Sequence, residues 1–416
     1  MSPHPPSENG PRPPAPRGGD EPSPPRYLDR RSTRLGWIVA VVGLNLLPLI
    51  LPWRGSPTGP ASGFVVAPPV LAAPTNSAPS FQAEFIDPAF HTPSVHVASL
   101  CELAGGRLLA AWYGGTREGH RDVAIYLATR DPGAAQWASA DPVVTRESAA
   151  RELDRYVRKV GNAVMFSDGG QRVWLLYVSI AAGGWSSSSL NLKTSADGGR
   201  TWSRSERLVL SPLFGVSELS RNQPARLADG GWCVPIYHEL LGKFPQLLWL
   251  PANGSVQAAV KTRPFGGATA FQPALVPLSA QRALLACRDY SPQRRVQLSR
   301  TEDGGRSWSA PTPAELPNPL SSLDAIRLRD GRVLLAFNDS EQLRDVLSLA
   351  VSPDGGLTWQ RAGTLDREAG QEFSYPFLLA TRDGLIHVVY TWKRTGIKHA
   401  TFNAAWLDAR MERAVK

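Results

Sequence analysis

The segment Ser195–Trp202, SADGGRTW, recurs as TEDGGRSW at Thr301–Trp308 and as SPDGGLTW at Ser352–Trp359. A degenerate copy, TRDPGAAQW, lies at Thr129–Trp137. The aspartates of these four boxes are residues 131, 197, 303 and 354, so their spacings are 66, 106 and 51 residues. The interval of 106 is about two units of the shorter period, which indicates an eroded copy near residue 250. A repeat of this length predicts a propeller or an array of similar units.

The stretches between the boxes have a common pattern of short strands and tight turns. One unit contains Ser322–Arg329, the turn Asp330–Gly331, Val333–Asn338 and Val346–Val351, followed by its box. Six such units fit into residues 81–410, and no helical period of useful length interrupts them. The sequence therefore predicts an all-β fold, a six-bladed β-propeller with four-stranded blades.

The first 80 residues differ in composition from the repeats. Residues 1–35 are rich in proline and arginine and predict a disordered cytoplasmic leader. Residues 36–53 contain no charged side chain and are bracketed by Trp37 and Trp53, which predicts a transmembrane signal anchor. Residues 54–80, rich in proline, alanine and serine, predict a linker.

The distribution of basic residues predicts an orientation for this anchor. Six arginines precede the apolar run, whereas Arg54 is the only basic residue between it and Arg107. This bias places the N-terminus in the cytoplasm and the propeller outside. The composition is typical of a GC-rich bacterium, so we expect an inner membrane and a propeller that faces the periplasm. The alternative is a cleaved signal peptide with a small-residue cleavage zone near Ala72–Ala73.

Charge and cysteine content exclude several classes of protein. The net charge of +9 comes from arginines scattered along the chain, without the basic stripe or motif of a nucleic-acid-binding protein. Three cysteines (Cys101, Cys233 and Cys287) and seven scattered histidines form no zinc motif, and no nucleotide or haem motif is present. We therefore expect no metal and no cofactor, and a buried structural role for each cysteine.

The boxes themselves are interpreted as structural, because a motif repeated around a ring cannot mark one active site. Aspartate and serine hydrogen-bond the turn backbone, glycine permits positive φ, and tryptophan packs between blades. In this feature the sequence resembles the sialidase (neuraminidase) superfamily, whose Asp-boxes have this form on a six-bladed propeller. The resemblance covers nearly all of residues 90–410.

Blade geometry predicts where a binding site lies. In an up-and-down sheet, the start of the first strand, the end of the second and the start of the third share one face, opposite the boxes. Arginine, carboxyl and aromatic side chains at these positions suit an acidic sugar. The residues at these positions include His96, Arg117, Glu118, Asp122, Tyr237, His238, Glu239, Gln272, Arg288, Arg344, Tyr375 and Arg394.

The resemblance implies roles for some of these residues. Sialidases bind the substrate carboxylate with three arginines, use an aspartate as acid/base, and attack with a tyrosine that a glutamate activates. Tyr375, in the segment Tyr375–Gly384, matches the nucleophile, and Asp122 matches the acid/base. Arg288 and Arg344 match the second and third arginines. Arg117, Tyr237 and His238 are further candidates for substrate binding.

Two positions depart from the family pattern. His96 stands where the first arginine is expected, and Gln272 stands where the glutamate is expected. A tyrosine with a pKa of about 10 needs a base, and glutamine cannot accept its proton. Glu239 or Glu118 are the candidates to replace that base.

These residues predict a membrane-anchored, sialidase-like exo-glycosidase that releases a terminal acidic sugar through a retaining tyrosine-nucleophile mechanism. A second interpretation is a hydrolase or lyase acting on another acidic, uronate-type glycan, in which His96, Tyr237 and His238 would matter more. A third is a non-catalytic glycan-binding propeller, which Gln272 favours. In each case the partner is an acidic glycan or sialoglycoconjugate.

Overall fold

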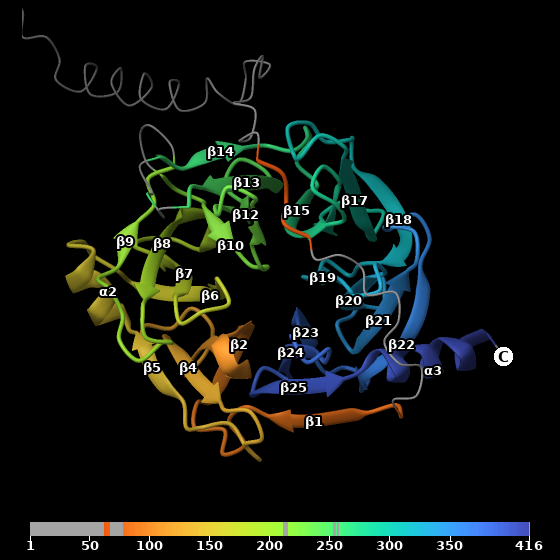
Figure 1. Ribbon diagram of the computed structural model, residues 1–416. Coiled ribbons are helices and arrows are strands. Elements are labelled where there is room, and N and C mark those ends of the chain that lie inside the picture. Colours follow the sequence, from red (N-terminus) through yellow and green to blue (C-terminus); the bar gives the residue numbers. More distant parts are fainter. Residues whose placement is uncertain (1–61, 67–77, 211–214, 253–254, 256–257, 416) are drawn as a thin grey trace, which may run out of the picture. The chain divides into compact units, whose positions relative to one another are not determined.

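The computed structural model describes residues 62–66, 78–210, 215–252, 255 and 258–415. Six antiparallel sheets are arranged around a central axis as the blades of a propeller (Figure 1), which confirms the predicted six-bladed all-β fold. The predicted leader, the predicted anchor and most of the predicted linker lie outside the described residues. Within the part of the chain that is described, no helix has the length and apolar character needed to span a membrane.

Four blades are simple meanders whose strands follow one another in chain order, with the first strand innermost. Blade 1 contains β2 (Ser94–Glu102), β3 (Leu108–Gly115), β4 (Ala124–Arg130) and β5 (Asp141–Val144), and blade 2 contains β6 (Lys159–Ser167), β7 (Val173–Ile180), β8 (Ser188–Ser195) and β9 (Glu206–Arg207). Blade 4 contains β15 (Ala270–Pro277), β16 (Ala283–Asp289), β17 (Arg295–Thr301) and β18 (Thr312–Pro317), and blade 5 contains β19 (Asp324–Arg327), β20 (Val333–Asn338), β21 (Val346–Ser352) and β22 (Gln360–Arg367).

The third and sixth blades differ from this plan. In blade 3 the inner strand is split into two short pieces, which both pair with the second strand: β10 (Leu219–Ser220) and β11 (Ala225–Arg226), then β12 (Trp232–His238), β13 (Phe244–Leu250) and β14 (Val260–Thr262). Blade 6 contains β23 (Phe373–Ala380), β24 (Ile386–Trp392), β25 (Gly396–Phe402) and, as its outer strand, β1 (Phe81–Phe85). Because β1 comes from the start of the propeller, its pairing with β25 closes the ring.

Short helices lie outside the sheets, at α2 (Arg146–Glu152), η1 (Ala104–Gly106), η2 (Trp185–Ser187) and α3 (Ala404–Val415). The sequence did not predict α3. Its start is capped by Asn403, whose side-chain oxygen accepts a hydrogen bond from the Trp406 amide at 3.0 Å. The Trp406 ring stacks on Phe81 of β1 at a centroid distance of 4.8 Å, so this helix covers the closing strand.

The boxes have the structural role that the sequence predicts. In the box of blade 2, the Asp197 carboxylate accepts hydrogen bonds from the amide and hydroxyl of Thr201, at 2.9 and 2.6 Å. These bonds hold the pKa of Asp197 below its usual range. Each complete box packs its second glycine against the preceding blade: Gly199 faces Leu109, Gly305 faces Trp249, and Gly356 faces Leu284. The boxes are therefore inter-blade contacts.

Residues 62–66, within the predicted linker, pack on the propeller. Phe64 is buried and lies 6.3 Å from the Trp249 ring of blade 3. The Phe64 amide donates to the Ala280 carbonyl at 2.9 Å, and the Val65 amide donates to the Arg226 carbonyl at 2.8 Å. This segment therefore joins blades 3 and 4.

Replacement of Gly356 should destabilise the propeller more than replacement of Gly370. Both glycines have positive φ (93° and 77°), so alanine at either position costs about 1–2 kcal/mol of backbone strain. A Cβ at Gly356 would also lie 2.7 Å from Leu284 Cδ2, whereas nothing lies within 4 Å at Gly370. We expect Gly356→Ala to lose a further 1–3 kcal/mol or so of unfolding free energy, measured by denaturant titration. Equal losses in the two variants would contradict the inter-blade role of the box.

Candidate active site

Four inner strands share one irregularity near the same end of the propeller axis. Val97 of β2, Asn162 of β6, Gln272 of β15 and Tyr375 of β23 have positive φ values of 47–55°, and the pairing register shifts at each of them. Such β-bulges bend a strand and redirect a side chain. All four side chains line the same pocket. Left-handed backbone is strained for residues other than glycine, and strain of this kind is concentrated at functional sites.

The pocket has a volume of about 310 Å³ and is strongly polar. It brings together eight of the residues that the sequence analysis selected: Tyr375, Glu118, Glu239, Arg288, Arg344, Arg394, Gln272 and Tyr237. Its other lining residues are Val97, Tyr113, Asn162, Trp185, Lys243, Phe271, Tyr290 and Leu320.

Four selected residues lie outside the lining. Asp122 is on the exposed loop between β3 and β4, where hydrogen bonds from Thr116 and His120 lower its pKa to about 2. Arg117 is exposed on the same loop. His238 stacks on Phe244 at 4.8 Å and accepts a hydrogen bond from the Leu241 amide, and burial lowers its pKa to about 4.

His96 lies behind the pocket instead of in its lining. The bulge in β2 changes the alternation of the strand, so that Val97 faces the pocket and His96 packs against Tyr375, with ring centroids 4.4 Å apart. The His96 Nδ1 lies 2.8 Å from the Thr391 hydroxyl. Burial, together with the surrounding arginines, holds the pKa of His96 well below its usual range, so the ring is neutral.

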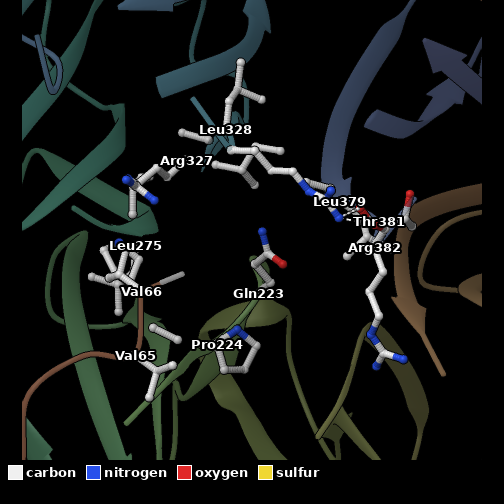
Figure 2. Close-up of a pocket in the computed structure, with 17 residues that line it drawn as sticks. Val65, Val66, Gln223, Pro224, Leu275, Arg327, Leu328, Leu379, Thr381 and Arg382 are labelled. Atoms are coloured by element: carbon white, nitrogen blue, oxygen red, sulfur yellow. Dashed lines mark hydrogen bonds between the residues drawn. The ribbon is translucent and has the colours of Figure 1, made fainter. Parts of the chain in front are cut away.

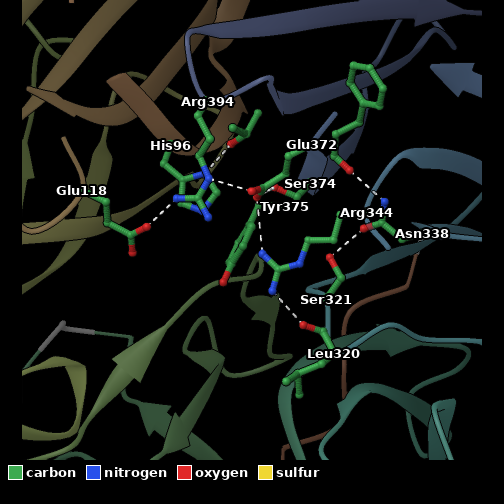
Figure 3. Close-up of polar contacts among 12 residues, drawn as sticks. His96, Glu118, Leu320, Ser321, Asn338, Arg344, Glu372, Ser374, Tyr375 and Arg394 are labelled. Carbon is green, nitrogen blue, oxygen red and sulfur yellow. Dashed lines mark hydrogen bonds and ion pairs between the residues drawn. The ribbon is translucent and has the colours of Figure 1, made fainter. Parts of the chain in front are cut away.

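Several cationic side chains lie near Tyr375, and Figure 3 shows two of them, Arg344 and Arg394. Its hydroxyl accepts a hydrogen bond from Arg288 Nη1 at 3.2 Å, and the guanidinium carbons of Arg221 and Arg344 lie 5.5 and 5.7 Å from the centre of its ring. Removal from water would raise the pKa of Tyr375, but Arg288 and Arg344 outweigh this effect and lower it below its ordinary value.

Gln272 does not contact the Tyr375 hydroxyl but belongs to a second network. Its Oε1 accepts a hydrogen bond from Arg288 Nη1 at 3.0 Å, and its Nε2 donates to the Tyr237 hydroxyl at 3.1 Å. Asn162 Nδ2 donates to the same hydroxyl, also at 3.1 Å. Among the described residues, no carboxylate hydrogen-bonds the Tyr375 hydroxyl.

Arg394 enters the pocket from the turn between β24 and β25 (Figure 3). Lys393 and Arg394 both have positive φ, 51° and 63°, and the Arg394 carbonyl accepts a hydrogen bond from the Val95 amide at 2.8 Å. Its guanidinium forms ion pairs with Glu118 and, at 2.9 Å, with Glu372. The sequence placed Arg394 and Glu118 on the rim but not Glu372, since the position of that side chain depends on a turn conformation that no motif reveals.

Two buried charges hold the strand of Tyr375 from below. Arg221, from the break between β10 and β11, donates through Nη2 to the Pro376 carbonyl at 2.7 Å. Asp324, at the start of β19, accepts a hydrogen bond from the Leu378 amide at 2.8 Å. Both contacts satisfy backbone groups of β23, which is the inner edge strand of its blade and has a strand partner on one side only.

A second cavity, of about 340 Å³, lies at the opposite ends of the inner strands (Figure 2). It has apolar walls with arginines among them, and the docked residues Val65 and Val66 form part of its lining. None of the described residues that line it is a carboxylate, histidine or tyrosine. Of these two cavities, the one at the Tyr375 end of the axis therefore contains the carboxylate and phenol groups.

No group of three or more metal-ligating side chains is found in the described part of the chain, and the three cysteines are free and buried. The arrangement at Tyr375 instead combines a phenol, several guanidinium groups and two carboxylates in one polar pocket. Such a set can bind an anionic ligand and place it against a nucleophile.

Comparisons with known proteins agree with this architecture. Residues 106–388 match the family described as BNR repeat-like domain. The chain is 29% identical over 240 residues to a sialidase of Micromonospora viridifaciens, an alignment that covers 52% of this chain and 35% of the relative. The chain thus spans about a third of that relative's length.

Solved structures of sialidases share the fold. A Hadza microbial sialidase superposes with a TM-score of 0.63 at 17% identity, covering 79% of this chain and 69% of that one. The intramolecular trans-sialidase of Ruminococcus gnavus superposes with a TM-score of 0.62 at 15% identity, covering 78% and 97% of the two chains. At these identities the likeness shows the fold alone.

Asp324 should make stability depend on pH. Burial raises its pKa to about 7, so between about pH 4 and pH 7 the folded chain retains a proton that the unfolded chain releases. The stabilisation from this group is therefore lost as pH rises through that range. The side-chain amide introduced by Asp324→Asn cannot ionise but keeps the acceptor for Leu378, so the loss should be smaller. Denaturant midpoints of the wild type and of Asp324→Asn at several pH values test this prediction. If the difference between the two midpoints does not change with pH, the role of Asp324 is contradicted.

Proposed function

Because the chain belongs to the BNR repeat-like family of the sialidase superfamily, we propose that its axial pocket removes a terminal acidic sugar, such as sialic acid, from a glycan. The observation that carries this proposal is the convergence of Arg288, Arg344 and Arg394 in one pocket with Tyr375, whose hydroxyl accepts a hydrogen bond from Arg288. Guanidinium groups bind carboxylates in bidentate fashion. The pocket volume of about 310 Å³ is in the range of small-ligand sites.

Tyr375 is the proposed nucleophile of a retaining reaction. With the sugar carboxylate on the arginines, the Tyr375 oxygen attacks the anomeric carbon and the aglycone oxygen leaves, which gives a glycosyl–tyrosine intermediate. Water then hydrolyses this intermediate with a second inversion, so that the configuration of the sugar is retained.

The proposed proton donor to the leaving group is Glu118. A general acid must first be within reach of the reacting oxygen, and Glu118 lines the pocket whereas Asp122 does not. In the free protein Glu118 forms an ion pair with Arg394, which lines the same pocket. A substrate carboxylate bound to Arg394 would therefore lie close to Glu118.

The variant Tyr375→Phe should lose at least about a thousand-fold in turnover of an aryl sialoside, because it lacks the attacking oxygen. The phenyl ring keeps the contacts with His96, Arg221 and Arg344 and loses only the hydrogen bond from Arg288, so folding and sialic acid binding should persist. Kinetics, denaturant unfolding and calorimetric binding measure the three properties. Unchanged turnover would contradict the role of Tyr375, and wild-type binding without turnover on any acidic glycan would support a non-catalytic propeller.

Paired variants distinguish the two carboxylates of the loop between β3 and β4. Glu118→Gln should reduce cleavage of a sialyl-oligosaccharide by about a hundred-fold or more, because its leaving group needs a proton. Cleavage of an aryl sialoside with an acidic phenol should fall much less. The matched variant Asp122→Asn should affect both substrates equally and by less than about tenfold. The reverse pattern would assign the proton donor to Asp122.

A uronate-type glycan remains the second candidate substrate, and its products distinguish the chemistry. A panel of acidic oligosaccharides can be incubated with the protein and analysed by mass spectrometry. Hydrolysis adds water across the cleaved bond, whereas elimination gives an unsaturated product that is lighter by one water. Release of free sialic acid from the sialylated members alone is the expected result.

A further inference from the structure

The hydroxyl of Tyr375 has a cation where a tyrosine nucleophile would be expected to have a base. Its hydrogen-bond partner is Arg288, and the corresponding amide, Gln272, is turned to Arg288 and Tyr237. An amide cannot accept the phenolic proton in a stable form. The question is therefore how the proton is lost from this oxygen.

The guanidinium groups near Tyr375 fall into two classes. Arg344 and Arg394 share the carboxylate of Glu372, and Arg394 also pairs with Glu118. Arg288 and Arg221 form no ion pair within the described part of the chain. Arg221 is 1% exposed, and its Nε and Nη1 have no hydrogen-bond acceptor; the Nε of Arg288 also lacks one.

A buried cation without a counter-ion is costly, by several kcal/mol in general. Asp324 attracts Arg221 electrostatically, but burial raises the pKa of this carboxyl to about 7, so it compensates the charge incompletely at neutral pH. The oxygen of Tyr375 is a group that can become an anion between Arg288 and the cations on its ring face. Its negative charge would supply the missing counter-ion.

We propose that Tyr375 acts as a phenolate held by Arg288, Arg344 and the underlying Arg221, and that no carboxylate base takes its proton. The O–H bond breaks, the electron pair stays on the phenolic oxygen, and the proton passes to water in the pocket. Arg221 is a positioning residue, because its guanidinium lies over the ring of Tyr375 and donates a hydrogen bond to the carbonyl of the next residue, Pro376. The ionisation is a property of the free protein, and only its use in catalysis rests on the proposed function.

Among the acidic, histidine and tyrosine side chains near Tyr375, Glu118 opposes this ionisation and three others are neutral. Glu118 raises the pKa of Tyr375, but less than Arg288 and Arg344 lower it. His96 is neutral, because burial lowers its pKa. Burial raises the pKa values of the neighbouring phenols Tyr113 and Tyr237, so they stay protonated.

Under this proposal Gln272 is a working part of the site. A glutamate at this position would pair with Arg288 and place a negative charge beside the phenolate, which would disfavour ionisation. The amide orients Arg288 through Oε1 but leaves its positive charge for Tyr375 and for a substrate carboxylate. Gln272→Glu should therefore raise the pKa of Tyr375, although it restores the carboxylate that a base-assisted mechanism requires.

Spectroscopic titration of tyrosinate absorbance tests the ionisation directly, without any substrate. The chain has nine tyrosines, so the signal of Tyr375 is the difference between wild type and Tyr375→Phe. Burial raises the pKa values of Tyr113, Tyr177, Tyr237 and Tyr390, so these phenols do not obscure an early transition. We expect a single tyrosinate with a midpoint clearly below the ordinary value of about 10.

The charge variants then identify the cause. Arg288→Met and Gln272→Glu should each raise the midpoint by about one pH unit or more, and Arg221→Met should do so where it folds. The matched control Arg263→Met, a partly buried arginine outside the pocket lining, should leave the midpoint unchanged. A midpoint at or above 10 or so in the wild type, or faster glycoside cleavage by Gln272→Glu, would overturn the proposal. A low midpoint without sialoside cleavage would contradict the proposed function alone.

Discussion

The backbone at the inner strands is the constraint on which the site depends. Bulges at Val97, Asn162, Gln272 and Tyr375 place four side chains in one pocket, but each bulge leaves buried backbone groups without strand partners. Polar side chains from neighbouring blades supply the missing bonds. Thr391 accepts from the Val97 amide at 3.2 Å, and Asn222 donates to the Gln272 carbonyl at 3.5 Å. The same side chains thus connect neighbouring blades and hold the backbone that presents the pocket residues.

One of these contacts between a side chain and the backbone also affects the electrostatics of the pocket. Arg221 satisfies the Pro376 carbonyl beside Tyr375, and to do so it brings a full positive charge into the interior of the propeller. A neutral donor could make the same hydrogen bond without the cost of a buried cation. An anion that forms or binds above Arg221 would offset this cost, and the centre of the Tyr375 ring lies 5.5 Å from the guanidinium carbon. If Tyr375 is the proposed phenolate, Arg221 both supports its strand and stabilises its charge.

The sequence predicts the parts of the molecule that repeat, and it misses those that depend on a local break in the repeat. Three boxes with an Asp-x-Gly core were enough to derive the propeller, because their turn chemistry is local. Tyr375, Arg288 and Arg344 were selected from blade geometry and from the resemblance to sialidases, and all three line the pocket. His96 was selected because it lies at the start of a first strand, where the resemblance implies an arginine, but the bulge that follows it leaves it outside the lining. The closing strand and the turn that presents Arg394 depend on contacts between distant parts of the chain, which no periodicity encodes.

The two departures from the sialidase pattern make sense when they are taken together. The resemblance implies an arginine at position 96 and a glutamate at position 272, and here both positions carry neutral groups. One positive and one negative charge are absent, so the net charge contributed by this pair of positions is the same. What changes is the location of the charge. Arg288 contacts the amide of Gln272 where the family pattern has a carboxylate, and the turn between β24 and β25 brings in Arg394, which has two carboxylate partners, Glu118 and Glu372. The positive potential is thereby concentrated at the phenolic oxygen of Tyr375, on the side where a glutamate would otherwise stand.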